Sequence, residues 1–128
     1  MLSYSFLLIA FIISINKDLA VYSQTCGTGT CYQGTVCSSA PAGKYSTGGV
    51  RAPCVDCPAG KYSVGGASSC PNVNAGYYSL LGTGTSATGN GICTPGRYGT
   101  GGSTTDQCTG PCIAGRYGTG GSTSSTCT

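Results

Sequence analysis

Apolar side chains are distributed very unevenly along this chain. Positions 2–15 form an uncharged apolar run of 14 residues, and this run contains both Phe residues. After residue 23 the large aliphatic residues are sparse and show no helical periodicity. Glycine, present 23 times, also argues against helix. The pattern therefore predicts only short strands and irregular turns beyond residue 23. The nine large aliphatic residues there are Val36, Val50, Val55, Val64, Val73, Leu80, Leu81, Ile92 and Ile113.

The apolar run itself is too short to span a bilayer comfortably and is typical of a secretory signal peptide. Val21 and Ser23 are small residues at the −3 and −1 positions of a cleavage site. We therefore assign 1–23 to a signal peptide, which leaves a secreted or cell-surface chain that starts at Gln24 and has no membrane span. The alternative is a signal anchor that stays in the membrane.

One sequence motif, called the phrase below, recurs in the remaining sequence. It consists of a small residue or Pro, then Gly, a basic residue and Tyr, followed shortly by paired glycines. Four copies lie at 41–49, 58–66, 95–102 and 114–121, and a worn copy, AGYYS, lies at 75–79. A period of roughly 16–20 residues predicts small tandem units stacked in an elongated array. We divide the chain into a Cys-containing segment at 24–36, repeat units at 37–57, 57–72, 93–111 and 112–128, and a degenerate unit with an enlarged loop at 73–92.

Cysteine usage indicates what holds these units together. All ten cysteines lie in the 105 residues after position 23 (128 − 23), a density typical of an exported disulfide scaffold. Three units place one Cys three residues before the glycine of the phrase and end on a second Cys, whereas the worn unit lacks both members. Bridges inside each unit are therefore predicted, and reduction should unfold the chain. The predicted pairs are Cys57 with Cys70, Cys93 with Cys108, Cys112 with Cys127, Cys37 with Cys54, and Cys26 with Cys31.

The phrase also predicts the local fold of a unit. Ala59 and Gly60 suit the two central positions of a type II turn, in which glycine accepts the required positive φ. We expect residues 61–63 to form a short strand, the paired glycines 65–66 to make a hairpin turn, and a return strand to end at Cys70. The fold class is therefore small, disulfide-rich and mostly β or irregular.

Two side-chain rows recur with the phrase. The tyrosines are expected to pack over the disulfides with their hydroxyls at the surface, or alternatively to stack on sugars. The basic residues would line one edge and suit an anionic glycan or an acidic protein, the alternative being solvated side chains beside each Tyr. Tyr77 interrupts this second row. The rows are Tyr45, Tyr62, Tyr78, Tyr98 and Tyr117, and Lys44, Lys61, Arg97 and Arg116.

The residue types that catalysis usually needs are scarce. The chain has no His, and the only carboxylate side chains after residue 23 are Asp56 and Asp106, in different units. The Cys-x-x-Cys at 54–57 would suggest zinc in a cytosolic protein, but the export signal favours disulfides. We therefore assign no catalytic residue, metal or cofactor, and no nucleic-acid partner.

Residues 57–70, CPAGKYSVGGASSC, resemble the cysteine-rich repeat of ephrin-receptor ectodomains, which also occurs in surface proteins of single-celled eukaryotes. The resemblance covers about 37–127, with Ala40 and Val73 standing where the repeat has cysteines. It implies an extracellular β-module, distantly similar to tumour-necrosis-factor-receptor and EGF-like repeats, that acts as a spacer or docks an extracellular protein or glycan. The expected function is non-enzymatic ligand docking, adhesion or a surface coat. The alternative is a secreted effector (growth factor, toxin or inhibitor) acting through the loop at 80–91.

Overall fold

A turn closed by one backbone hydrogen bond opens every unit of the structure, a computed structural model that describes residues 23–127. In the turn at 58–61 the amide of Lys61 donates to the carbonyl of Pro58 at 3.1 Å, and Gly60 has φ +80°. These are the features of a type II turn, so the sequence prediction is confirmed there. The same turn recurs, with φ between +75° and +81°, at Gly29, Gly43, Gly76, Gly96 and Gly115.

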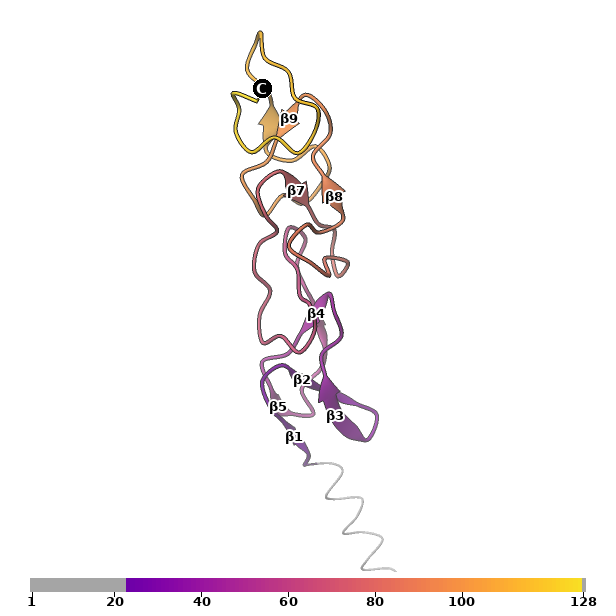
Figure 1. The fold of residues 1–128 in the computed structure, drawn as a ribbon. Coiled ribbons are helices and arrows are strands. Elements are labelled where there is room, and N and C mark those ends of the chain that lie inside the picture. The colour runs from indigo at the N-terminus through magenta and orange to yellow at the C-terminus, as the bar shows by residue number, and fades with distance from the viewer. Residues whose placement is uncertain (1–22, 128) are drawn as a thin grey trace, which may run out of the picture.

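The six turns define six units that follow one another in a single elongated stack, from the indigo N-terminal end to the yellow C-terminal end (Figure 1). The predicted signal peptide lies outside the described residues except for Ser23. Within residues 23–127 there is no helix, and none that could cross a membrane. The small, disulfide-rich, mostly β and irregular fold class is confirmed. We name the units A (26–39), B (40–56), C (57–72), D (73–92), E (93–111) and F (112–127).

The short strand that follows a turn pairs with the last residues of the same unit. In unit B, β4 (Lys44–Tyr45) pairs with β6 (Val55–Asp56), and in unit C, Lys61 bridges to Asn72. The prediction that the return strand ends at Cys70 is therefore wrong, because the pairing residues follow that cysteine. The remaining strand pairs are β1 (Thr25–Cys26) with β5 (Gly49–Val50), β2 (Thr30–Gln33) with β3 (Val36–Ser39), β7 (Tyr77–Tyr78) with β8 (Gly91–Ile92), and β9 (Arg97–Tyr98) with β10 (Gly110–Pro111).

The paired glycines join neighbouring units instead of making hairpin turns. The amide of Gly66 in unit C donates to the carbonyl of Ala40 in unit B at 2.7 Å. In the other direction, the amide of Gly43 in unit B donates to the carbonyl of Ser63 in unit C at 2.8 Å. The second bond recurs at all five junctions, as Gly29 to Ser46, Gly43 to Ser63, Gly60 to Ser79, Gly76 to Gly99 and Gly96 to Gly118. Backbone groups that would otherwise need solvent are thus satisfied between units.

The turn glycines also contact the unit two places further along the stack. A Cβ built on Gly60 of unit C would lie under 3.0 Å from the carbonyl oxygen of Gly102 in unit E. Equivalent overlaps occur between units A and C, B and D, and D and F. Glycine is therefore required at these positions for its positive φ and for its lack of a side chain.

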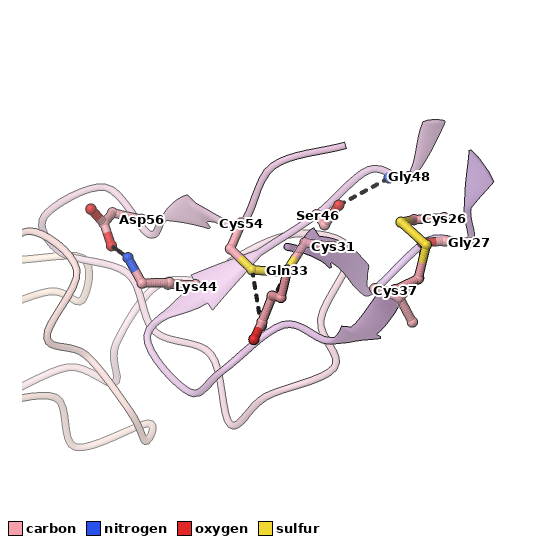
Figure 2. The surroundings of a disulfide bond; sticks show 11 residues. Cys26, Gly27, Cys31, Gln33, Cys37, Lys44, Ser46, Gly48, Cys54 and Asp56 are labelled. Atoms are coloured by element: carbon pink, nitrogen blue, oxygen red, sulfur yellow. Dashed lines mark hydrogen bonds and ion pairs between the residues drawn. A yellow bond between two sulfur atoms is a disulfide. The ribbon is translucent and has the colours of Figure 1, made fainter. Parts of the chain in front are cut away.

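Disulfides hold the stack as the sequence predicts in units C, E and F, where Cys57–Cys70, Cys93–Cys108 and Cys112–Cys127 each bridge one unit. The other two predicted pairs are wrong, since the structure joins Cys26 to Cys37 and Cys31 to Cys54. Figure 2 shows both of these bridges.

The segment at 24–36 explains both errors. It is part of a complete sixth unit in which the basic residue and the Tyr of the phrase are replaced by other residues. Cys26 stands three residues before the turn glycine Gly29, so it is the opening cysteine of unit A, and Cys37 closes that unit. Cys31 occupies the position that Tyr holds in the other units. It is therefore free to bridge to Cys54 of unit B, whose opening position is the buried Ala40.

Unit D keeps the same backbone without a disulfide. The amide of Gly82 donates to the carbonyl of Cys57, just as the amide of Gly66 in unit C donates to the carbonyl of Ala40. Leu81 and Gly82 therefore take the place of the paired glycines. Gly89, with φ +52°, stands where Cys108, with φ +50°, closes unit E. A Cβ on Gly89 would lie 3.0 Å from Cγ1 of the buried Val73, so the valine side chain fills the space of the missing bridge.

The loop at 80–91 is one residue longer than its counterpart in unit E. The carbonyl of Gly84 accepts from Ser63 as that of Ser103 accepts from Ser79, which makes Gly84 and Ser103 equivalent. Gly82 and Gly102 are also equivalent, because their amides donate to Cys57 and Val73, the opening residues of the preceding units. Two residue steps separate Gly82 from Gly84 but only one separates Gly102 from Ser103, so unit D has one extra residue. The loop is thus longer than that of unit E and occupies the equivalent place in the stack.

Sulfur and small polar side chains make the core. Cys31, Cys57 and Cys93 are fully buried, as are the serines that follow the repeat tyrosines in units B, C and D, namely Ser46, Ser63 and Ser79. Of the nine large aliphatic residues only Val73 is buried, and the other eight are exposed. The cross-links and the backbone hydrogen bonds between units therefore replace an aliphatic core.

Candidate binding edge

The four predicted basic residues occupy one equivalent position, the residue directly after the turn glycine. Lys44 lies in β4 and Arg97 in β9, while Lys61 forms the corresponding bridge in unit C and Arg116 follows the turn of unit F. Tyr77 in β7 interrupts the series in unit D. The position recurs from unit B to unit F of one stack, and we call this row the basic edge.

Local partners differ along the basic edge. Lys44 forms an ion pair with Asp56, its cross-strand neighbour, as Figure 2 shows. Lys61 Nζ donates to Asn72 Oδ1 at 2.8 Å, and Arg97 Nε donates to the carbonyl of Gln107. These last two partners are neutral. The charge of Lys44 is therefore balanced within its own unit, whereas Lys61 and Arg97 are held in place by neutral acceptors.

The repeat tyrosines lie beside the basic edge, at the next residue of the chain. A Cβ on Gly91 would meet Cε1 of Tyr78 at 3.5 Å, and one on Gly110 would meet Cε1 of Tyr98 at 3.5 Å. The rings of Tyr78 and Tyr98 thus cover the glycines opposite them in their strand pairs, where the backbone has no side chain of its own. Tyr45, Tyr62, Tyr78 and Tyr98 are half-buried, while Tyr117 of unit F is exposed.

A shallow hollow of about 190 Å³ lies where units B and C meet. It is lined by Tyr45, Pro58, Lys61, Ser69 and Cys70, mostly through apolar surface. Tyr45 thus lies near the disulfide of the adjoining unit, as expected for this tyrosine. The hollow brings together one member of each predicted row, Tyr45 from unit B and Lys61 from unit C.

The backbone contact that places Tyr45 on the next unit recurs for two other repeat tyrosines. Tyr45 makes an isolated parallel bridge to Ala67, as Tyr78 does to Ser103 and Tyr98 to Ser122. A tyrosine of one unit is therefore followed by a basic residue of the next at the B/C, D/E and E/F junctions. At the C/D junction Tyr77 stands in place of the cation.

Pro58 and Ser69 are functional candidates that the sequence reading missed. They lie 11 residues apart, next to Cys57 and Cys70 respectively, and the disulfide between these cysteines brings them to the same hollow. Once that bridge is predicted, the neighbours of both cysteines become candidates. Their placement against Tyr45 depends on how units B and C stack.

The Cys-x-x-Cys at 54–57 offers no free thiol. Cys54 is bonded to Cys31 and Cys57 to Cys70, and every cysteine of the chain is in a disulfide. Within residues 23–127 no three His, Cys, Asp or Glu residues are grouped to hold a metal ion.

Comparison with known proteins finds no match for this chain among protein-family models, curated proteins or solved structures.

Proposed function

We propose that this protein is a non-enzymatic extracellular docking array, acting in adhesion, in ligand docking or as part of a cell-surface coat. The observation that carries the proposal is the stack itself, in which six equivalent units repeat one backbone arrangement along an elongated body (Figure 1). Such stacks present extended surfaces on which one side-chain position recurs many times.

Disulfide content supports the extracellular part of the proposal. Five disulfides hold 105 residues, and they persist in oxidising compartments but are rare in the cytosol. With one large aliphatic residue buried, the fold depends on these bridges. A protein of this kind is suited to secretion or the cell surface, where its cysteines stay oxidised.

Repetition supports docking. A weak contact made once per unit becomes strong when several units engage the same partner, because the later contacts are intramolecular. The ephrin-receptor-like phrase at 57–70 points to the same kind of role, that of a spacer or docking surface outside the cell.

The alternative of a secreted effector depends on a distinctive loop at 80–91. That segment supplies the stacking contacts of unit D: Gly82 and Gly84 form hydrogen bonds with unit C, and the Gly82 carbonyl lies against Gly43 of unit B, as the equivalent residues of other units do. It is one residue longer than its counterpart in unit E. This favours docking over the effector reading.

Two measurements test the proposal. The first is localisation in the producing cell: intact cells should display the protein on the surface or release it, with every cysteine protected from alkylation. Cytosolic protein with free thiols would contradict the proposal.

The second measurement is a loop exchange in the full chain. Residues 80–88 of unit D are replaced by the equivalent residues 100–107 of unit E, which preserves the stack. Attachment of labelled protein to producing cells or their matrix is expected to remain within about two-fold of wild type, because docking is shared among units. Complete loss of activity with the disulfides intact would support the effector instead.

A further inference from the structure

We infer that the basic edge from unit C to unit F, with the tyrosine that precedes each cation, binds an acidic polysaccharide. This inference rests on the proposed docking function and names its partner class. The primary contact is the hollow between units B and C, and the Tyr78–Arg97 and Tyr98–Arg116 combinations repeat its two main elements.

Lys61 supplies the charged contact. Its ammonium group has three donors, and one of them is directed to Asn72 Oδ1 at 2.8 Å. That bond fixes the side chain beside the hollow and leaves two donors for the carboxylate or sulfate group of a sugar. A charge-assisted bond to such an oxyanion is stronger than a bond between neutral groups.

The rest of the hollow fits the body of a sugar ring. Tyr45 and Pro58 supply apolar surface for the C–H face of a pyranose, and the hydroxyl of Ser69 can bond to a ring substituent. The hollow is open and holds about 190 Å³, which suits one sugar residue of a longer chain. We therefore expect weak binding at each junction and useful affinity only across several.

Charge along the stack favours the same partner. Within residues 23–127 there are five Lys or Arg residues and two Asp residues, and Asp56 is paired with Lys44. Positive charge therefore continues past unit B through Lys61, Arg97 and Arg116. A linear polyanion that follows one edge can contact these cations in turn, and binding should weaken as salt increases.

An acidic protein segment fits this edge less well. A bound peptide usually adds a strand to an exposed sheet edge or inserts side chains into apolar pockets. Within residues 23–127, the eight strands other than β2 and β3 have two residues each, too few for a peptide to add a strand along the edge. The short strands offer no continuous edge, so a glycan is the better occupant.

The test uses the full disulfide-bonded chain and four probes: heparin, hyaluronan, neutral dextran and polyglutamate. The wild-type protein is expected to bind heparin and hyaluronan and not to bind dextran. Its affinity for polyglutamate should be lower than for the two acidic polysaccharides. Lys61→Gln and Arg97→Gln should each lower affinity for heparin about two- to five-fold, the effect of one exposed charge pair. The matched control is Lys44→Gln with Asp56→Asn, which removes an ion pair at constant net charge and should leave affinity unchanged.

Tyrosine variants separate a glycan from a purely electrostatic edge. Tyr45→Leu should weaken binding of both acidic polysaccharides about three-fold at unchanged charge, while Tyr45→Phe keeps it, because the ring supplies the contact. Intact disulfides and unchanged circular dichroism show that each variant is folded.

Three results would overturn the inference. They are no binding of either acidic polysaccharide, equal elution of wild type and the Lys61→Gln/Arg97→Gln double variant, and equal affinity for polyglutamate with no effect of Tyr45→Leu. If the protein still attaches to cells in any of these cases, the docking function is supported and only its partner is different.

Discussion

Replacing Gly60 by alanine tests the contact between units two apart, and the chain contains its own control in Gly96. Both residues occupy the third position of the same turn, with φ +80° and +79°. A Cβ on Gly60 would lie under 3.0 Å from the Gly102 carbonyl, whereas one on Gly96 meets nothing within 4 Å. The two substitutions therefore share the same backbone strain and differ only in the steric overlap.

The magnitudes follow from these two contributions. An L-residue in the left-handed region costs roughly 1–2 kcal/mol, which applies to both variants. Overpacking adds about 1–3 kcal/mol at Gly60, because backbone atoms of unit E must move. Gly60→Ala is therefore expected to lower the free energy of unfolding by roughly 2–5 kcal/mol, and Gly96→Ala by roughly 1–2 kcal/mol.

Amide hydrogen exchange on the disulfide-bonded protein measures the difference locally. The amide of Gly60 is bonded to Ser79 and that of Val73 to Gly60, so residue 60 and Val73 should lose protection in Gly60→Ala. Guanidinium unfolding followed by circular dichroism gives the global values. Equal destabilisation by the two substitutions would refute the stacking of unit C against unit E.

Three further predictions follow from the core and from unit D. Full reduction with dithiothreitol should abolish the folded circular-dichroism signal and expand the chain in size-exclusion chromatography, since the bridges replace an aliphatic core; an unchanged compact shape would contradict this. Val73→Cys with Gly89→Cys should form a sixth disulfide after a shift of the Tyr78 carbonyl, and free thiols in the non-reduced peptide map would count against it. Closing this loop contributes about 3 kcal/mol, whereas the positive φ and the overlap at residue 89 cost roughly 2–5 kcal/mol, so no large net gain in stability is expected. Asn90→Ala should cost about 1–2 kcal/mol, because Asn90 Oδ1 accepts from the Leu80 amide at 2.7 Å and from Thr83 Oγ1 at 2.8 Å. Asn90→Asp, which keeps the acceptor, should cost less, and exchange of the Leu80 amide measures both.

Local features of a unit could be predicted from the sequence because neighbouring residues determine them. The turn at 58–61 depends on Gly60 accepting a positive φ, and the same turn forms at the other copies of the phrase in this chain. The pairs Cys57–Cys70 and Cys93–Cys108 close short loops across one turn, so spacing alone was enough to predict them.

The candidate binding edge could be predicted in part. The equivalent positions in the phrase predicted that the basic residues recur once per unit, and in the structure each of them directly follows its turn glycine. The ion pair of Lys44 with Asp56 and the contribution of Pro58 to the hollow were missed. Both depend on the pairing of β4 with β6 and on the junction between units B and C.

The sequence by itself determined the unit: its turn, its short strand, its tyrosine and, in three cases, its disulfide. Only the tertiary structure decided that 26–39 is a unit as well and that Cys31 forms a disulfide with Cys54. It also decided that the Val73 side chain, packed beside Gly89, fills the space of the disulfide that unit D lacks. The physical reason is the range of the interactions. A turn is set by the φ preferences of adjacent residues, whereas a bridge between units or a glycine under a distant carbonyl depends on where the stacked backbones meet.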